Sequence, residues 1–97
     1  MTKVIYAPAA QADLVEIGGY IAQDSERNAE KFVAELRAKA LRIAQMPRIY
    51  KIRDEFATDI RSAAFGNHLI LFRTIDSGIE VLHIIHGARD LKRLFET

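Results

Sequence analysis

The stretch Ile79-Glu80-Val81-Leu82-His83-Ile84-Ile85-His86-Gly87-Ala88-Arg89-Asp90 decides the fold. Its apolar, β-prone first part predicts a buried strand. Gly87 lets the backbone turn sharply where this strand ends. The turn leaves Arg89 and Asp90 at the strand end, where charged groups can face a partner. A short helical pattern follows and predicts a C-terminal helical turn that closes the core, with apolar positions at Leu91, Leu94 and Phe95.

Two more β-prone runs precede this strand, at about residues 60–65 and 68–75. The segments between the three runs, Gly66-Asn67 and Asp76-Ser77-Gly78, consist of turn-forming residues. Such spacing predicts consecutive antiparallel hairpins. Residues 48–59, which come before them, are expected to form a loop.

The first part of the chain predicts a strand followed by a helix. Residues 3–6 are β-prone, and Pro8 stops the run because proline suits a first helical turn. Apolar residues then recur at helical spacing over residues 10–22. Gly18-Gly19 in the middle should cost about 1 kcal/mol each relative to alanine when exposed, so we expect a close helix crossing there.

A second helix should begin after Ser25, a candidate N-cap. An apolar stripe continues from Ala29 to Ile43, and Pro47 ends it because the residue before a proline disfavours helical geometry. The two helices predict an αα-hairpin. We therefore expect one α+β domain over residues 1–97, ordered β-α-α-β-β-β with a short C-terminal helix, in which the hairpin packs on a small antiparallel sheet.

Composition narrows the function classes. The chain has 97 residues, near the usual size of one domain, and it contains no cysteine, which excludes disulfides and thiolate chemistry. With three scattered histidines, we expect no metal and no cofactor. No stretch reaches the ~20 apolar residues that span a bilayer, and the N-terminus lacks a signal-like segment, so we expect a cytoplasmic protein without membrane contact.

Charge is distributed unevenly along the chain. The net charge is +1, so direct sequence-specific binding of nucleic acid by the protein alone is not expected. Residues 28–73 carry 9 basic and 5 acidic groups, a balance of +4, whereas residues 1–27 carry 2 and 4, a balance of −2. The basic part is either a solvated face or a binding surface.

A series of residues in the second half resembles the ParE branch of the RelE/ParE toxins. The matching positions are Pro47, Arg53, Glu55, Arg61, Gly66, Ile70, Phe72-Arg73, Val81 and His86-Gly87-Ala88-Arg89-Asp90. The resemblance implies a toxin of a type II toxin–antitoxin system that poisons DNA gyrase or a related topoisomerase and is neutralised by a cognate ParD-like antitoxin. The chain departs from the family pattern at His68, Phe72 and His83, which puts details of target contact in doubt.

The RelE branch of the same family cuts messenger RNA in the ribosome, which requires cations and proton-transfer groups. Strand alternation places Leu69, Leu71 and Arg73 on the sheet face opposite Ile70 and Phe72. Compared with RelE-type ribonucleases, Leu69 stands in place of an arginine and Phe95 in place of a tyrosine. The sequence therefore favours a non-enzymatic toxin. A ribosome-dependent ribonuclease remains the alternative, as does a degenerate toxin that only binds its antitoxin and regulates its operon.

Seven residues are candidates for contact with the target or the antitoxin: Arg53, Arg61, Leu69, Leu71, Arg73, His83 and Arg89. Arginine forks suit carboxylate and phosphate recognition, and the leucines would be exposed apolar positions on the outer sheet face. The alternative for the cations is internal pairing, for example of Arg53 with Glu55. By alternation, His83 should share a face with Val81 and Ile85. The grooves beside the two helices are further candidate docking sites.

Overall fold

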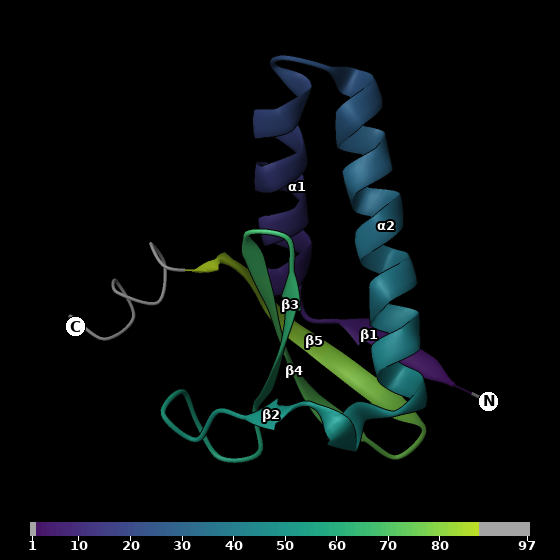
Figure 1. Cartoon of the computed structure of the whole chain (residues 1–97), viewed down its shortest axis with the longest axis vertical. Coiled ribbons are helices and arrows are strands. Elements are labelled where there is room, and N and C mark those ends of the chain that lie inside the picture. The colour runs from purple at the N-terminus through teal and green to yellow at the C-terminus, as the bar shows by residue number, and fades with distance from the viewer. Residues whose placement is uncertain (1, 88–97) are drawn as a thin grey trace.

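In the computed structural model, residues 2–87 are described. Figure 1 shows two helices standing side by side over one sheet, with their connecting turn at the far end from the strands. The elements are β1 (Lys3–Tyr6), α1 (Pro8–Ala22), α2 (Glu26–Gln45), the 3₁₀ turn η1 (Pro47–Ile49), β2 (Lys51–Ile52), β3 (Arg61–Phe65), β4 (His68–Ile75) and β5 (Gly78–His86). The expected C-terminal helix and Arg89 lie outside the described residues.

The sheet has the order β1-β5-β4-β3-β2. The predicted hairpins are confirmed, because β3 pairs with β4 and β4 with β5 in antiparallel register. Gly66 forms the first turn with φ of 58°, a conformation that glycine adopts without strain. Two details differ from the prediction. The loop over 48–59 contains the short edge strand β2, and β1 pairs with β5 in parallel, so the sheet is mixed.

The parallel pairing of β1 follows from topology. The connection between β1 and β5 contains both helices and three strands, so no tight turn forces the two strands to run in opposite directions. The register begins with Lys3 opposite Gly78. A Cβ atom added at Gly78 would lie 1.8 Å from the backbone oxygen of Lys3. Glycine at this position is therefore what allows β1 to approach the start of β5.

The two helices begin differently. Pro8 occupies the first turn of α1, and Ala7 at its N-cap provides no side-chain hydrogen bond. In contrast, α2 has the predicted cap, because the Ser25 hydroxyl accepts a hydrogen bond of 3.1 Å from the backbone N–H of Asn28. Such a cap stabilises a helix by about 1 kcal/mol. No helix within residues 2–87 is both long and apolar enough to cross a membrane.

The core lies between the helical hairpin and one face of the sheet. Leu36, Ala40 and Ile43 of α2 are fully buried against strand residues such as Ile70 and Phe72. Burying each large apolar side chain stabilises the fold by about 1.5–3 kcal/mol. The prediction that Ile70 and Phe72 face the helices is confirmed, and this fixes Leu69, Leu71 and Arg73 on the outer face.

A β-bulge interrupts the alternation along β5. Leu71 pairs with His83 but Phe72 pairs with Val81, so Leu82 is an extra residue without a partner in β4. Val81 and Ile84 consequently belong to the same core cluster although they are three positions apart. The expectation that His83 shares a face with Val81 is therefore wrong. His83 lies on the outer face, because the bulge reverses the side-chain direction between these two residues.

Candidate functional site

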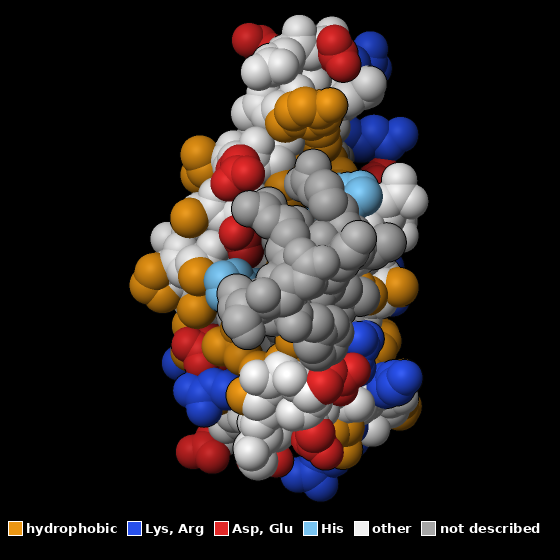
Figure 2. Space-filling view, turned by 90° about the vertical axis from the view of Figure 1, so that its left-hand side faces the viewer, with side chains coloured by type: hydrophobic (Ala, Val, Ile, Leu, Met, Phe, Trp, Pro, Cys, Tyr) orange, Lys and Arg blue, Asp and Glu red, His pale blue; other side chains and the backbone are white. Residues whose placement is uncertain are grey.

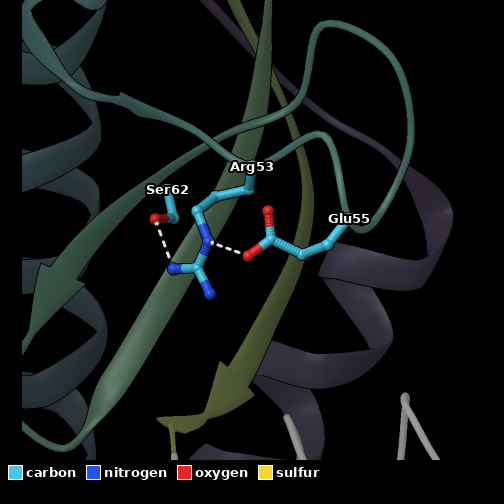
Figure 3. A network of polar contacts seen from close by, with 3 residues as sticks. All are labelled: Arg53, Glu55 and Ser62. Atoms are coloured by element: carbon cyan, nitrogen blue, oxygen red, sulfur yellow. Dashed lines mark hydrogen bonds and ion pairs between the residues drawn. The ribbon is translucent and has the colours of Figure 1, made fainter.

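Arg53 lies at the centre of a small polar network on the outer face (Figure 3). Its Nε donates to Glu55 Oε2 at 2.9 Å, and its Nη1 donates to the Ser62 hydroxyl at 3.1 Å. The guanidinium also lies 5.2 Å from the centre of the Phe56 ring, and only 15% of the side chain is exposed. The pKa of Glu55 is lowered, first by its own backbone N–H and then by Arg53. Arg53 therefore holds the loop after β2 to β3.

Arg61 forms a second internal anchor. Its Nη1 donates to the backbone oxygen of Tyr50 at 2.8 Å and to that of Arg48 at 3.3 Å. These carbonyl groups belong to η1 and to the residue that follows it, where no regular strand ladder donates to them. Arg61 thus ties the segment between α2 and β2 to the sheet.

Arg73 is paired across strands. It lies opposite Glu80 in the β4–β5 register, and its Nε donates to Glu80 Oε1 at 2.6 Å. The Arg73 side chain is 54% exposed, so this pair contributes little to stability, about 0–1 kcal/mol. Three of the four candidate arginines lie within the described residues. Each of the three binds a partner inside the chain, which agrees with the alternative of internal pairing.

The two outer-face leucines differ in exposure. Leu69 is half-buried, whereas only 4% of Leu71 is exposed. The expectation that Leu71 is an exposed docking position is therefore wrong. The reason is that β4 is a central strand, so Leu71 lies between Ser62 of β3 and His83 of β5.

His83 and α1 meet at the open edge of β5. The β1–β5 ladder stops at the pair Tyr6–Val81, so the backbone N–H groups of β5 beyond that point need other acceptors. Asp13 Oδ2 accepts from the Ile84 N–H at 2.9 Å and lies 3.1 Å from His83 Nδ1. Asp13 therefore clamps α1 to the strand edge. Sequence reasoning missed this role, since the two segments are far apart in the chain.

The other two histidines pack on the helix side of the sheet. His68 and His86 are directly opposite in register, with ring centres 5.5 Å apart, and His68 also contacts Phe32. This arrangement is typical of packed aromatic side chains. Among the residues described, no group of three or more His, Cys, Asp or Glu side chains could hold a metal ion.

A groove runs between α1 and α2. Its volume is about 470 Å³, and it is lined by Tyr6, Gln11, Leu14, Val15, Gly18, Gly19, Val33 and Arg37. Val15 is 77% exposed, and Arg37 lies over the Tyr6 ring at 4.9 Å. Burial raises the pKa of Tyr6, while the charge and hydrogen bonding of Arg37 oppose this effect. The groove thus combines apolar walls with one cation.

The two glycines in this groove do not serve the close helix crossing that the sequence suggested. A Cβ atom at Gly18 would make ordinary contact with Val33 Cγ2 at 3.8 Å, and one at Gly19 would meet nothing within 4 Å. Both positions therefore have room for alanine. Their missing side chains leave the backbone of α1 bare on one side of the groove. Figure 2, which views the molecule from the side of α1, shows hydrophobic side chains reaching the surface in its upper and middle parts.

Comparison with known proteins identifies the family to which this chain belongs. Residues 4–91 match the family model described as the ParE toxin of the type II toxin–antitoxin system parDE. The chain is 31% identical over 94 residues to Toxin ParE1 of Mycobacterium tuberculosis, in both strain CDC 1551 and strain H37Rv, covering 95% of this chain and 96% of the relative. The chain belongs to the ParE toxin family of type II toxin–antitoxin systems.

A solved structure agrees with this assignment at the level of the fold. The chain superposes with a TM-score of 0.72 on a protein from the structure titled "Chromosomal ParDE TA system from P. aeruginosa", at 20% identity. The match covers 89% of this chain and 96% of the other. The mixed sheet and helical hairpin are thus shared with a protein of low sequence identity.

Proposed function

We propose that this toxin acts in the cytoplasm by binding DNA gyrase or a related topoisomerase, without catalysing a reaction itself, and that a ParD-like antitoxin neutralises it. Family membership supports the toxin role. The observation that carries the non-enzymatic mechanism is the outer face of β4, where apolar Leu69 stands in place of the arginine of RelE-type ribonucleases. A leucine offers neither a charge to hold phosphate nor a proton to transfer.

The state of the nearby cations supports the same mechanism. Arg53, Arg61 and Arg73 each donate to acceptors within the chain, so turning them toward a scissile phosphate would compete with those internal bonds. Cleavage by the ribosome-dependent route needs preorganised charge at the reacting phosphate. Binding to a macromolecule makes no such demand.

The groove between α1 and α2 is the docking site that we assign to the antitoxin. Bare backbone at Gly18 and Gly19 allows another chain to approach closely, and exposed Val15 supplies an apolar contact. Arg37 at the groove wall can pair with a carboxylate of the bound segment. An apolar segment with an acidic residue fits this lining, which corresponds to a helix or extended chain laid into a groove.

A supercoiling assay with purified gyrase tests the function. The wild-type toxin should inhibit supercoiling, and preincubation with the antitoxin from the neighbouring gene should restore it. Message cleavage on translating ribosomes without gyrase inhibition would instead establish the ribonuclease. A protein that is folded yet harmless in both assays, and that does not slow growth when expressed without antitoxin, would be a degenerate toxin.

The docking site has its own matched pair of variants. Val15→Asp places a charge in the groove, whereas Ala38→Asp places the same charge on the exposed side of α2 and away from the groove lining. Both variants should still inhibit gyrase. Only Val15→Asp should escape neutralisation, and equal neutralisation of both would place the antitoxin elsewhere.

A further inference from the structure

The fold brings together two of the three histidines that are scattered along the sequence. His68 begins β4 and His86 ends β5, and the two residues lie directly opposite each other in the antiparallel register. Directly opposite residues of an antiparallel pair have Cβ atoms about 4.5–5.5 Å apart. The two ring centres are 5.5 Å apart, and the ring planes are inclined at 80°. Two imidazoles therefore lie next to each other at the end of the β4–β5 hairpin that is away from its turn.

Backbone contacts on both sides hold the two histidines in this position. His68 follows the tight turn at Gly66 and pairs with Phe65 of β3. Beyond His86, the Gly87 N–H donates to the Asn67 carbonyl oxygen at 2.8 Å. A Cβ atom at Gly87 would lie only 3.2 Å from this oxygen, so glycine suits the close approach. The placement of the pair thus depends on the strands and not on contact between the two rings.

The pair lies on the helix side of the sheet beside aromatic side chains. The Phe32 ring of α2 is 5.2 Å from the His68 ring and 5.4 Å from the Phe65 ring, measured between centres. Both histidines are half-buried, so their rings are sheltered on one side and still reach solvent. An apolar surrounding of this kind limits the access of water to a ligand set.

The distance between the rings suits the binding of one metal ion by both. Imidazole is a preferred ligand of divalent zinc, copper and nickel. With metal–nitrogen bonds of about 2.0–2.1 Å and tetrahedral angles, two imidazole ring centres on one zinc ion are separated by about 5–5.5 Å. The observed 5.5 Å lies at the upper end of this range. The rings therefore need only turn about their side-chain bonds, without a change in strand pairing.

We propose that His68 and His86 together bind Zn²⁺ or another divalent ion that prefers imidazole, and that the ion links β4 to β5. Within residues 2–87 there is no group of three His, Cys, Asp or Glu side chains that could hold a metal, so water fills the remaining positions of the ion. The chain contains no cysteine, and the ion would supply a reversible cross-link where small domains often have a disulfide. This site is independent of the proposed antitoxin and gyrase.

His83 provides the matched control, because it is an imidazole on the opposite face of the same sheet. Its Nδ1 lies 3.1 Å from Asp13 Oδ2, an arrangement that also occurs behind histidines that bind zinc. His83→Gln removes this imidazole and leaves the pair of His68 and His86 intact. Comparison of the three histidines thus tells which of the two faces binds the ion.

Calorimetric titration with zinc chloride, in a buffer that does not bind zinc, tests the proposal. The wild-type protein should bind one ion per chain. His68→Phe keeps an aromatic ring against Phe32 but removes the ring nitrogens, and it should weaken binding at least about tenfold, because even the loss of a residue that only supports a ligand costs about 10–100-fold. His86→Gln should have the same effect, whereas His83→Gln should bind as the wild type does.

Thermal unfolding gives a second measurement on the same proteins. When free zinc exceeds its dissociation constant about a hundredfold, the midpoint of wild-type unfolding should rise by about 5–10 °C, because the ion binds the folded pair. Magnesium, which prefers oxygen ligands, should leave the midpoint unchanged. Circular dichroism without zinc shows whether each variant is folded.

Several results would overturn the proposal. Unchanged zinc binding by folded His68→Phe would show that the pair is not the site, and loss of binding in His83→Gln would place the ion on the outer face. Histidine side-chain NMR makes the same distinction without a substitution. Zinc should shift the ring signals of His68 and His86, and a shift of the His83 signals alone would contradict the assignment.

Discussion

The two helices of the hairpin differ in how well the chain itself supports them. In α2, a continuous stripe of apolar residues is buried, the remaining positions are largely charged, and Ser25 caps the N-terminus. In α1, only Ala10 and Leu14 are buried, whereas Val15 and Tyr20 are 77% and 74% exposed. A helix with apolar residues around most of its surface normally lies in a buried environment. The comparison indicates that the apolar surface of α2 is buried within the protein itself. In contrast, α1 leaves apolar surface exposed that is suited to burial by a partner.

The largest expected effect comes from truncating matched apolar residues on the two helices. Leu36→Ala in α2 should lower the free energy of unfolding by about 2–5 kcal/mol, because the side chain is fully buried. Val15→Ala in α1 should change it by less than about 0.5 kcal/mol. Urea unfolding followed by circular dichroism measures both. Similar losses would mean that Val15 is buried in the protein in solution, which would break the comparison.

The next test concerns Asp13, the side chain through which α1 accepts a hydrogen bond from β5. Asp13→Ala should destabilise the protein by about 1–3 kcal/mol, because the Ile84 N–H loses its acceptor at a residue that is 3% exposed. Asp13→Asn keeps an oxygen acceptor and should cost less. Glu16→Ala, at an exposed position of the same helix, serves as the control. Equal stability of the Asp13 and Glu16 alanine variants would argue against the clamp.

Replacing a glycine of α1 by alanine should have opposite effects on the stability of the toxin and on its binding to the antitoxin. Gly19→Ala should stabilise the isolated toxin by about 1 kcal/mol, because an added Cβ meets no atom within 4 Å and alanine favours a helix. The same change should weaken antitoxin binding if the bare backbone is a contact. Thermal unfolding measures the effect on stability, and calorimetric titration of the same sample measures the effect on antitoxin binding. A Gly19→Ala variant that is more stable and binds as tightly as wild type would show that the bare backbone there does not contact the antitoxin.

The smallest expected effect is a change in the pKa of Tyr6, which lines the groove between the two helices. The pKa of Tyr6 lies above its ordinary value of 10.0 because of burial, and Arg37 partly opposes the shift. Arg37→Ala should therefore raise this pKa further. Because the folded pKa exceeds the unfolded one, the stability contributed by Tyr6 is present below pH 10.0 and is lost as pH rises through the folded pKa. Phenolate absorbance, compared with a Tyr6→Phe variant, identifies the titration, and a lowered pKa in Arg37→Ala would contradict the assigned role of Arg37.

Much of the fold could be predicted because local patterns encode it. Helical spacing, Ser25 and the turn segments placed both helices and the hairpins of β3, β4 and β5 correctly. The pairing of β1 with β5 could not be derived in this way, since it joins distant parts of the chain. The short strand β2 was missed for the same reason, because its two residues are defined by pairing with Arg61 and Ser62 and not by a β-prone run.

The candidate site was harder to predict from the sequence. Strand alternation gave the correct face for Leu69, Leu71 and Arg73, but burial of Leu71 depends on its neighbours in other strands. A single extra residue at Leu82 reversed the expected direction of His83 relative to Val81. Whether an arginine binds inside the chain or outside depends on which carbonyl or carboxylate the fold brings near it. Grooves beside the two helices were expected as docking sites, but Gly18 and Gly19 were expected to mark a close helix crossing, which the structure does not have.

The placement of β1 has a consequence for biosynthesis. This strand leaves the ribosome before the other described elements, yet β5, its strand partner in the described sheet, is the last of them to be translated. At a rate of about 5–20 residues per second, β1 must wait several seconds for its strand partner. A nascent chain therefore leaves β1 unpaired until the residues of β5 have emerged, so the helical hairpin is synthesised before the sheet can close.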